Sequence, residues 1–525
     1  MSNPTTFNDH WNAAVSAHGD RMFLVFRRDG YTDASFTYAQ FDAVADAVAA
    51  TLSHHGVSSG TGVHMCLRNC PAFIAVWLAA ARLGAWIIPV DPSSSPRDLK
   101  RQTARTQPVV GIVGSQREED YRASVDAGMA IITVAETAED VLLGGPLRMV
   151  DAITAEGSAS SESVLSPDDR LAVMFTSGTT SEPKGVILTQ ANYAYIAETM
   201  SSLAGVRPEH RWFVTLPLFH GNAQYYCFSA AIASGASVAM THGFSASRWI
   251  DQARELEVTH ASLFAAPIRM ILSRTDPAQP PLSLTHVWYA QNLSEGHYQR
   301  FEQLCGTGPR QLYGMTETTA IVSCDLSDRP CHDTIGHPIE GRRIAVVSPL
   351  TGDRARTGEP GVLLLAGTRG ADLFEGYLDD PSANDKAFID FDGQTWFSTG
   401  DLVSVDDDGA LSFVGRVDDV IKVSGENVSL TEVEASLAEA PGVLEVAVIA
   451  APDEVRDTVP VAFVVAEDDA NRPTIDALKI FASENLPKAA RPQKWEIVES
   501  LPKTSVGKIR RFQLDATTTE ASANS

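Results

Sequence analysis

The chain has 525 residues, 44% of them hydrophobic and 20% charged, and its formal net charge at pH 7 is −25. This length exceeds one ordinary hydrophobic core, so we expect a globular protein of two or more domains. The acidic balance argues against nucleic acid or an anionic membrane as a partner, because proteins that hold such polyanions are basic.

The N-terminal segment, residues 1–12, is polar and lacks the basic and then apolar pattern of a signal peptide. The apolar run Ala72–Val90 is interrupted by Arg82 and Gly84 and closes at Pro89. It therefore predicts a buried helix followed by a buried strand, and no membrane span.

Six scattered cysteines form no disulfide framework, which is typical of proteins of the reducing cytoplasm, so we expect a cytoplasmic protein. Cys324, Cys331 and His332 lack a fourth ligand at a zinc-site spacing, and no metal site is expected there.

Short apolar runs bounded by turn residues alternate with helical patterns along residues 1–417, which predicts an α/β fold. The predicted strands and helices include, in chain order, Phe41–Leu52 (helix), Leu171–Phe175 (strand), Trp249–Leu256 (helix), Ala261–Phe264 (strand), Val287–Tyr289 (strand), Ile344–Val347 (strand) and Val362–Leu365 (strand). We expect a large N-terminal domain of layered, mostly parallel sheets and helices that binds ATP and an acyl group.

Residues 418–515 are expected to form a small, mobile α+β domain, and residues 516–525 a disordered tail. Ser429 and Glu432 have capping-box spacing and open a predicted amphipathic helix. Two strands, Val443–Ala450 and Val459–Val465, and a helix, Thr474–Glu484, follow.

The strongest local signal is the segment Thr176–Gly185, which directly follows a predicted strand and reads TSGTTSEPKG. Its hydroxyls, glycine amides and Lys184 can donate to phosphate oxygens, as an acidic protein with anionic substrates requires. The segment lacks Walker spacing, and alone it also fits a polar surface loop.

Five further segments follow in order. They are Leu216–His220, Tyr313–Glu317, Ser398–Asp401, Gly415-Arg416 with Lys422, and Pro502–Lys508. From Phe36 to Arg510 the ordered set resembles the adenylate-forming superfamily, which includes acyl-CoA synthetases, peptide-synthetase adenylation domains and firefly luciferases. Asn292–Ser294, Phe219–Gln224 and Gly425–Ser429 look similar to crotonobetaine/carnitine-CoA ligase-like members.

The resemblance implies that ATP, Mg²⁺ and coenzyme A are bound. The residues implied to bind the nucleotide and coenzyme A are Thr176, Ser177, Gly178, Thr179, Thr180, Lys184, Ala290, Gln291, Asn292, Tyr313, Gly314, Met315, Asp401, Arg416, Lys422 and Gly425. Within this set Tyr313 would stack on adenine and Asp401 would accept from the ribose hydroxyls.

Four residues are implied to act in catalysis. Thr316 would contact the α-phosphate, Glu317 would hold Mg²⁺, and Lys508 would be the mobile catalytic lysine. His220 would be the gate to the acyl pocket, although a lone histidine is also common in a core. Asp418 is the implied hinge between the two domains.

Two departures from the family pattern matter. Ser181 replaces a usual glycine of the phosphate loop, which costs backbone freedom if φ must be positive. Tyr289 replaces a glycine and is predicted to shorten the acyl tunnel. The predicted acyl pocket is lined by His220, Gly221, Ala265, Tyr289 and Gly314, and its small residues suggest a wide, short space for a bulky or cyclic acid. The alternative is that these small residues only permit close backbone packing.

The predicted function is an ATP-dependent carboxylic acid–coenzyme A ligase that acts through an acyl-AMP. One alternative is an acyl-AMP ligase that loads the phosphopantetheine of an acyl carrier protein. A second is a nucleotide-binding scaffold without turnover. An α-amino acid substrate is not expected, because His220 stands where amino-acid-activating members carry an Asp.

Overall fold

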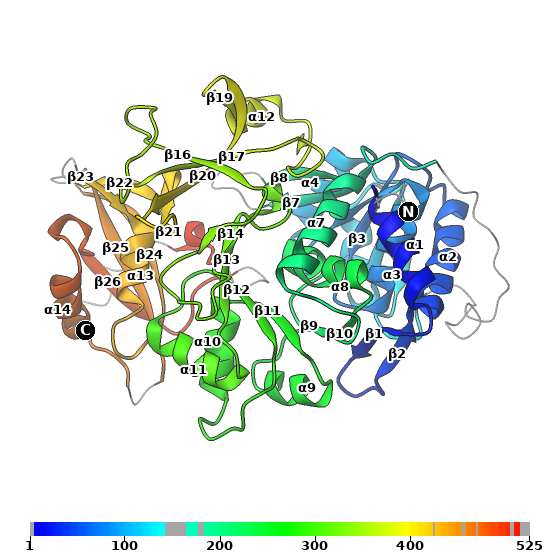
Figure 1. The fold of residues 1–525 in the computed structure, drawn as a ribbon, viewed down its shortest axis with the longest axis horizontal. Helices are drawn as coiled ribbons and strands as arrows, with labels where there is room; N and C mark the ends of the chain where they lie inside the picture. The colour runs from blue at the N-terminus through cyan, green and yellow to red at the C-terminus, as the bar shows by residue number, and fades with distance from the viewer. Residues whose placement is uncertain are drawn as a thin grey trace.

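The computed structural model describes residues 5–141, 164–176, 183–423, 426–453, 457–468, 471–503 and 509–514. The described strands form four sheets (Figure 1).

The first sheet is mostly parallel and has the order β15-β14-β13-β12-β11-β9-β10-β1-β2. Its strands are β1 (Met22–Arg27), β2 (Ala34–Thr37), β9 (Arg211–Val214), β10 (Ser237–Thr241), β11 (His260–Phe264), β12 (His286–Ala290), β13 (Arg310–Tyr313), β14 (Ser323–Cys324) and β15 (His337–Pro338). The pairs β1–β2, β13–β14 and β14–β15 are antiparallel, so the antiparallel strands lie at its two edges.

The second sheet has the order β18-β8-β7-β4-β3-β5-β6 and a parallel centre. Its strands are β3 (Gly62–Cys66), β4 (Trp86–Pro89), β5 (Val110–Gly114), β6 (Ala130–Val134), β7 (Arg170–Thr176), β8 (Lys184–Thr189) and β18 (Gly376–Tyr377). The β7–β8 and β8–β18 pairs are antiparallel, and this edge carries part of the candidate site.

Helices fill the space between these two sheets and cover their outer faces. The inner helices are α1 (Phe7–His18), α2 (Tyr38–His54), α3 (Pro71–Leu83), α7 (Gln190–Leu203), the π-helix η2 (Asn222–Ser229) and α8 (Ala230–Ser234). The helices α9 (Trp249–Glu255), α10 (Ala265–Arg274) and α11 (Glu295–Cys305) cover the first sheet, and α4 (Pro96–Thr106) and α5 (Glu118–Ser124) cover the second. The main core is therefore the apolar layer between the sheets.

The run Ala72–Val90 forms α3 and β4, as predicted, and nearly all side chains of α3 are buried. Among the described residues, no helix has both the length and the apolar character needed to cross a bilayer.

A third sheet is antiparallel throughout, unlike the first two. It consists of β16 (Arg343–Val347), β17 (Gly361–Ala366), β19 (Phe388–Phe391), β20 (Gln394–Val405) and β21 (Leu411–Arg416), with α12 (Pro381–Ala387) beside it. The predicted strands Ile344–Val347 and Val362–Leu365 lie in this sheet, where they pair with each other.

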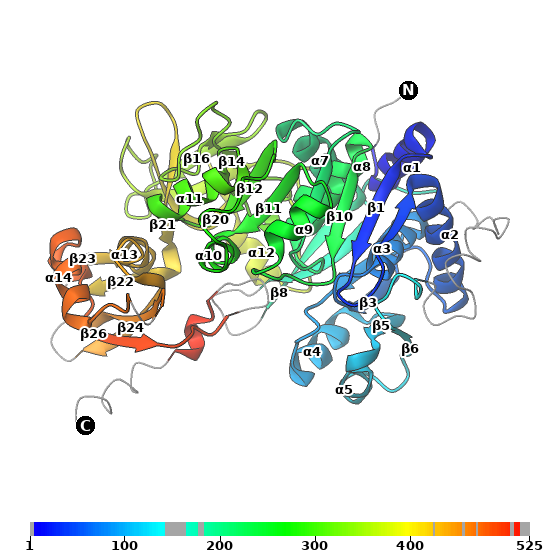
Figure 2. The ribbon, with the colours of Figure 1, turned by 90° about the horizontal axis from the view of Figure 1, so that it is seen from below.

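The fourth sheet belongs to the smaller C-terminal part, at the left of Figures 1 and 2. It contains β22 (Val420–Val423), β23 (Glu426–Ser429), β24 (Val443–Asp453), β25 (Asp457–Ala466) and β26 (Lys494–Val498), with α13 (Leu430–Leu437) and α14 (Ile475–Asn485). Ser429 caps α13 by accepting from Glu432 N, and Thr474 caps α14 in the same way. These elements have their own apolar cluster, so the predicted α/β fold with a smaller C-terminal α+β domain is confirmed, whereas the boundary at residue 418 stays a prediction.

Candidate functional site

The predicted phosphate loop connects two paired strands. Thr176, the last residue of β7, pairs with Lys184, the first residue of β8, in an antiparallel ladder. Ser177, Gly178, Thr179, Thr180 and Ser181 lie outside the described residues. The Lys184 ammonium lies 4.8 Å from the centre of the Tyr377 ring, a cation–π distance that directs it toward the neighbouring strand β18.

Glu317 lies in the short 3₁₀ helix η3 (Thr316–Thr318), just after β13. Its side chain is buried, with a 5% exposed fraction, and its Oε1 accepts a 3.0 Å hydrogen bond from the Tyr377 hydroxyl. Burial raises the pKa of Glu317, and the Tyr377 hydrogen bond and the charges of Arg416 and Lys184 oppose that rise. Thr316 begins the same turn and is half-buried.

This environment fits a magnesium ion. The described residues contain no group of three His, Cys, Asp or Glu side chains that would form an all-protein metal site. Mg²⁺ commonly binds through one or two carboxylates and the phosphates of its substrate, and Glu317 provides one buried carboxylate close to Lys184. A cation at Glu317 would also offset the cost of burying the ionised carboxylate.

Asp401 on β20 is the centre of a second buried cluster. Its Oδ2 accepts a 2.5 Å hydrogen bond from the Tyr313 hydroxyl, and its Oδ1 accepts a 2.6 Å bond from Arg416 Nη1. Asp401 and Arg416 are partners in the β20–β21 ladder, which fixes their separation. Burial alone would lower the pKa of Arg416, but Asp401 and nearby acidic groups outweigh it and raise that pKa. A carboxylate offers about four acceptor sites, and the Asp401 side chain uses two of them in these two bonds.

The predicted adenine segment follows β12. Ala290 ends the strand and is half-buried, whereas Gln291 and Asn292 are exposed. Gln291 has φ = 72°, which is uncommon for a residue other than glycine, and Gln311 Nε2 donates to Asn292 Oδ1 at 3.1 Å. These groups stand at the carboxyl end of a parallel strand, where open α/β sheets bind ligands.

Gly314 and Met315 are half-buried and connect β13 to η3. The Met315 amide donates to Thr318 Oγ1 at 3.0 Å. A side chain at Gly314 would have its Cβ 3.2 Å from Ile321 Cα and 3.3 Å from the Tyr226 hydroxyl, so this glycine permits a close approach to η2.

His220 and Gly221 precede the π-helix η2. The half-buried His220 ring meets Phe264 edge-on, with centroids 5.7 Å apart, and Gly221 lies against the Tyr225 ring. Asn222 Nδ2 donates to Ser262 Oγ at 2.9 Å, which ties η2 to β11. π-helical turns occur frequently at functional sites.

The predicted acyl pocket is divided by the first sheet. A Cβ added at Gly221 would lie 3.1 Å from the Tyr225 ring, and one added at Gly314 would lie 3.3 Å from the Tyr226 hydroxyl, so both glycines lie beside η2, on the inner face. Tyr289 and Ala265 instead belong to the apolar cluster under α9, α10 and α11.

The structure shows where Tyr289 lies, and its predicted effect on the acyl tunnel stays a prediction. Its side chain is 0% exposed, and its hydroxyl donates to Gln311 Oε1 at 3.2 Å. Successive side chains of a strand point to opposite faces, so Trp288, which belongs to the main core, occupies the face toward η2.

Of the predicted residues of the C-terminal part, the structure describes Lys422 and Asp418, and the charge of Asp418 acts on Arg416. Lys422 is exposed on β22, and Asp418 is exposed in the 3₁₀ turn η4 (Val417–Asp419). Gly425 and Lys508 lie outside the described residues.

Sequence reasoning did not find Tyr377 or Arg342. Tyr377 reaches Glu317 because β18 pairs with β8, opposite Val186, and no local pattern indicates that pairing. Arg342 stands in a run of polar turn residues, where a buried side chain is not expected, yet it is buried beneath the Glu317 loop.

Comparison with known proteins shows the family. Residues 11–378 match the model of the AMP-binding enzyme family, and residues 432–508 match that of the AMP-binding enzyme C-terminal domain. The 4-coumarate–CoA ligase 3 of Oryza sativa subsp. japonica is 28% identical over 98% of this chain and 93% of its own length. Crotonobetaine/carnitine–CoA ligase of Salmonella typhimurium is 28% identical over 96% of this chain and 98% of its own length.

Solved structures share the fold. The anthranilate CoA ligase AuaEII in complex with anthranoyl-AMP has a TM-score of 0.86 at 23% identity, covering 100% of this chain and 99% of that one. ATP-bound MatB from Rhodopseudomonas palustris has a TM-score of 0.84 at 21% identity, covering 98% of both chains. With the two family matches spread over the large and small parts of the molecule, the chain belongs to the AMP-binding enzyme family.

Proposed function

We propose that this protein is an ATP-dependent carboxylic acid–coenzyme A ligase. In the first step a carboxylate oxygen attacks the α-phosphorus of ATP, the bond to the β-phosphate oxygen breaks, and pyrophosphate leaves. In the second step the thiolate of coenzyme A attacks the carbonyl carbon of the acyl-AMP, and AMP leaves. The relatives named as CoA ligases match nearly the whole chain and support both steps.

The observation that carries the proposal is the proximity of two buried clusters. Asp401 with Tyr313 and Arg416 provides acceptors and a cation for a ribose and its phosphate. Glu317 with Tyr377 and Lys184 provides a carboxylate for Mg²⁺ and a cation for the outer phosphates. The charge of Arg416 influences Glu317, so the clusters act on one site.

Adenylation joins two anions, so the site must supply positive charge where negative charge develops. Lys184 and Arg416 supply part of it, and bound Mg²⁺ would neutralise phosphate charge. We assign the catalytic cation beside the carboxylate to Lys508, and the hinge that moves it to Asp418. Both assignments rest on the family resemblance of their segments.

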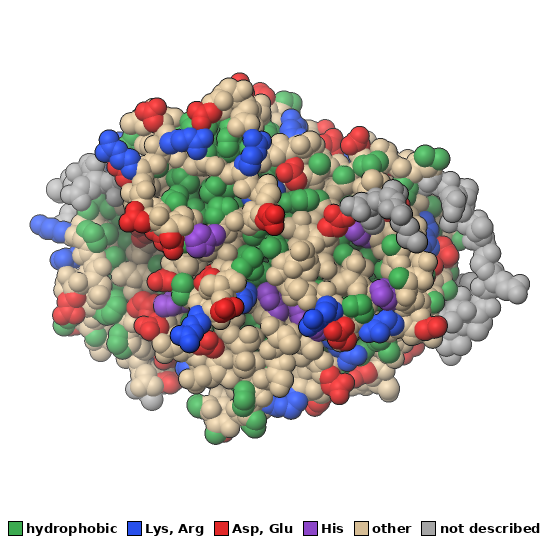
Figure 3. All heavy atoms as spheres, viewed as in Figure 1, with side chains coloured by type: hydrophobic (Ala, Val, Ile, Leu, Met, Phe, Trp, Pro, Cys, Tyr) green, Lys and Arg blue, Asp and Glu red, His purple; other side chains and the backbone are tan. Residues whose placement is uncertain are grey.

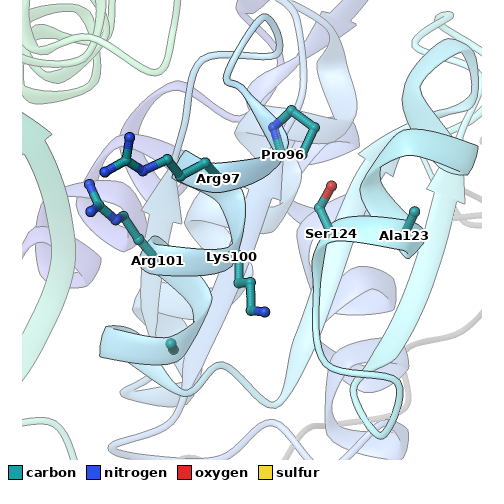
Figure 4. A pocket seen from close by; sticks show the side chains of 7 residues that line it. Pro96, Arg97, Lys100, Arg101, Ala123 and Ser124 are labelled. Carbon is teal, nitrogen blue, oxygen red and sulfur yellow. The ribbon is translucent and has the colours of Figure 1, made fainter.

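A basic cavity offers a place for the nucleotide end of coenzyme A. It has a volume of about 490 Å³ and lies between α4 and α5 (Figure 4). Arg97 and Arg101 extend to the same side of α4, and Lys100 extends from the same helix in a different direction. Like charges this close on a helix destabilise it slightly, by about 0.2–0.5 kcal/mol per pair. Their clustering in a chain of net charge −25 therefore favours an anionic ligand.

Helix α4 also borders the phosphate loop. A second cavity of about 170 Å³, on the same helix, is lined by Gln102 and Arg105, by Phe175, which precedes that loop, and by Pro183, which lies in it. Arg105 donates to Pro183 O at 2.9 Å. A ligand whose phosphates occupy the first cavity would therefore be bound beside the nucleotide site.

The carrier-protein alternative makes a different prediction for this cavity. A phosphopantetheine arm lacks the 3′-phosphorylated nucleotide of free coenzyme A, so a carrier-loading enzyme would gain nothing from Arg97 and Arg101. The R97A/R101A variant is expected to raise the KM for coenzyme A about tenfold or more, as loss of two charge-assisted contacts implies. The KM for pantetheine should change little. The matched control is R122A on α5, where Arg122 pairs with Glu118.

The function itself is tested with a panel of carboxylic acids, scored by hydroxamate trapping and pyrophosphate release, with and without coenzyme A. We expect ATP-dependent hydroxamate formation with at least one acid and thioester formation only when coenzyme A is added. Transfer to a carrier protein but not to coenzyme A would establish the alternative. If no acid caused pyrophosphate release, the result would favour the nucleotide-binding scaffold without turnover.

The six free cysteines fit our inference of a cytoplasmic protein, where ATP and coenzyme A are available.

A further inference from the structure

Arg342 is a buried arginine beneath the loop that carries Glu317. It precedes β16, and its side chain is only 6% exposed. Its guanidinium group donates to four backbone carbonyls: Thr318 O, Ala320 O at 3.1 Å, Ile321 O at 3.3 Å and Asp372 O at 2.7 Å. It makes no ion pair with any residue in the described part of the chain.

Burying a guanidinium group without an ion pair is unfavourable, because carbonyl dipoles and the charge of the nearby Asp372 only partly replace the lost hydration. Burial accordingly lowers the pKa of Arg342. An apolar side chain of similar length would fill the same space without that cost. We therefore expect Arg342 to have a structural role that requires several hydrogen-bond donors in a fixed planar arrangement.

The loop that it holds is strained. Thr319 has φ = 61° and ψ = −98°, a conformation that a β-branched residue rarely adopts. Such backbone persists only where the surroundings fix it. Arg342 binds the carbonyls on both sides of Thr319, those of Thr318 and Ala320, and Thr319 Oγ1 donates to Asp372 O at 3.0 Å.

Arg342 also connects the Glu317 loop to the helix α7, which follows the strand β8 at the end of the phosphate loop. The Arg342 guanidinium lies 5.0 Å from the centre of the Tyr195 ring on α7, the helix that directly follows β8. From α7, Asn192 Nδ2 donates to Ala371 O at 2.6 Å and Leu373 O at 2.8 Å. The next residue, Phe374, donates its amide to Glu317 O at 3.0 Å.

We propose that Arg342 is the positioning residue that fixes the Glu317 carboxylate for Mg²⁺, relative to the strand that begins at Lys184. Its guanidinium group donates hydrogen bonds both to the strained turn after Glu317 and to the segment 371–374, and so fixes the two relative to each other. The proposal rests on the assignment of Glu317 to Mg²⁺ in the proposed function.

The test compares R342M, R342K and a control, R211M. Arg211 lies on β9, where its guanidinium donates to Leu256 O at 2.7 Å and Ser237 Oγ at 3.1 Å, so R211M also removes backbone-binding donors. Binding of Mn²⁺ is measured by electron paramagnetic resonance with ATP and without any acid. The Mg²⁺ concentration that gives half-maximal pyrophosphate exchange is measured separately.

We expect R342M to weaken Mn²⁺ binding about tenfold or more, as loss of outer-shell support does at other metal sites, and to raise the half-maximal Mg²⁺ concentration to match. R342K keeps the charge but not the planar fork, so its loss should be intermediate. R211M should lower the melting temperature without changing Mn²⁺ binding.

Unchanged Mn²⁺ binding in folded R342M would overturn the proposal. If R342M does not fold, the test rests on R342K. Mn²⁺ binding by R342K equal to that of the wild type would then overturn the proposal. Wild-type protein that binds no Mn²⁺ with ATP would instead contradict the assignment of Glu317 and leave the proposal without a basis.

Discussion

The Tyr377 hydroxyl donates a 3.0 Å hydrogen bond to the buried Glu317 carboxylate, although 59 residues lie between them in the sequence. Because the ring of Tyr377 also faces Lys184, one side chain contacts both the carboxylate assigned to Mg²⁺ and the cation of the phosphate loop.

We expect Y377F to lower kcat/KM of adenylation for Mg-ATP about tenfold to a hundredfold, because a hydrogen bond to a charged group contributes about 1.5–3 kcal/mol. Pyrophosphate exchange at varied Mg²⁺ concentration measures the change. The control is Y38F, which loses bonds to Ala231 O and Ala236 O in the main core. Y38F should reduce stability only, and an equal loss of activity in both variants would contradict a specific role for Tyr377.

The second prediction concerns nucleotide affinity. D401N keeps the shape of Asp401 but removes the charge that pairs with Arg416, so we expect the Kd for ATP to rise about tenfold to a hundredfold. Isothermal titration calorimetry with ATP measures it. D42N, which disrupts the ion pair with Arg82 in α3, should leave that Kd unchanged. An unaltered Kd in D401N would remove Asp401 from the nucleotide site.

The third prediction separates the two half-reactions. K508A is expected to slow adenylation by a factor that corresponds to about 2–4 kcal/mol, the range for a preorganised electrostatic group. Thioester formation from supplied acyl-AMP should continue at the wild-type rate, because that step breaks a bond that is already activated. Single-turnover measurements of each step test this, and equal loss in both would count against Lys508.

The fourth prediction is a loss of stability in mild acid. His210, just before β9, lies beside His260 on β11, and His260 lies beside His286 on β12, with ring centroids 4.6 Å and 5.7 Å apart. Burial lowers the pKa of all three, that of His260 to about 4, and each ring disfavours a charge on the next.

These histidines are neutral in the folded state and take up protons first in the unfolded state, whose pKa is about 6.5. The free energy of unfolding should therefore fall as pH drops below about 6.5, and the His260 contribution alone reaches about 3 kcal/mol near pH 4. Urea unfolding at pH 7, 6 and 5 measures the slope. H260N should flatten it, whereas H55Q, at an exposed position, should not.

The fifth prediction concerns acyl-chain length. Trp288 lies on the face of β12 toward η2, so W288L should enlarge the acyl site and favour longer acids. Each added methylene that becomes buried contributes about 0.8 kcal/mol, which is about fourfold in kcat/KM. Y289L should destabilise the cluster under α10 and leave the length preference unchanged. If Y289L changes the preference and W288L does not, the assignment of faces is wrong.

The sequence predicted the architecture well because local signals decided it. The run Ala72–Val90 contains Gly84, which takes the left-handed conformation that ends α3, and Ser429 caps its helix as expected. The buried strand His286–Ala290 shows the limit of such signals. Its residues Trp288 and Tyr289 are both large and buried, so no alternation indicated which of them lies on the face toward η2.

The contacts of the candidate site depend on pairings between distant segments. Asp401 and Tyr313 were predicted as separate nucleotide contacts, and only the structure shows that the tyrosine hydroxyl binds the carboxylate. Tyr377 required the β8–β18 pairing, and Arg342 required a fold in which a polar turn becomes buried. Local sequence patterns do not predict such contacts between residues that are far apart in the chain.

If the acyl site lies beside the π-helix η2, as predicted, the number of residues in this part of the chain would affect substrate choice. Its hydrogen bonds span one residue more than those of an α-helix, so deleting a single residue from Asn222–Ser229 would allow an ordinary helix of the same direction. The residues before the deletion would then rotate by about 100° relative to those after it. Gly221 and Asn222 would turn away from β11 while α8 kept its place. The loss of one codon here would thus remodel the predicted acyl site in a single mutational event, without changing any residue predicted to bind ATP.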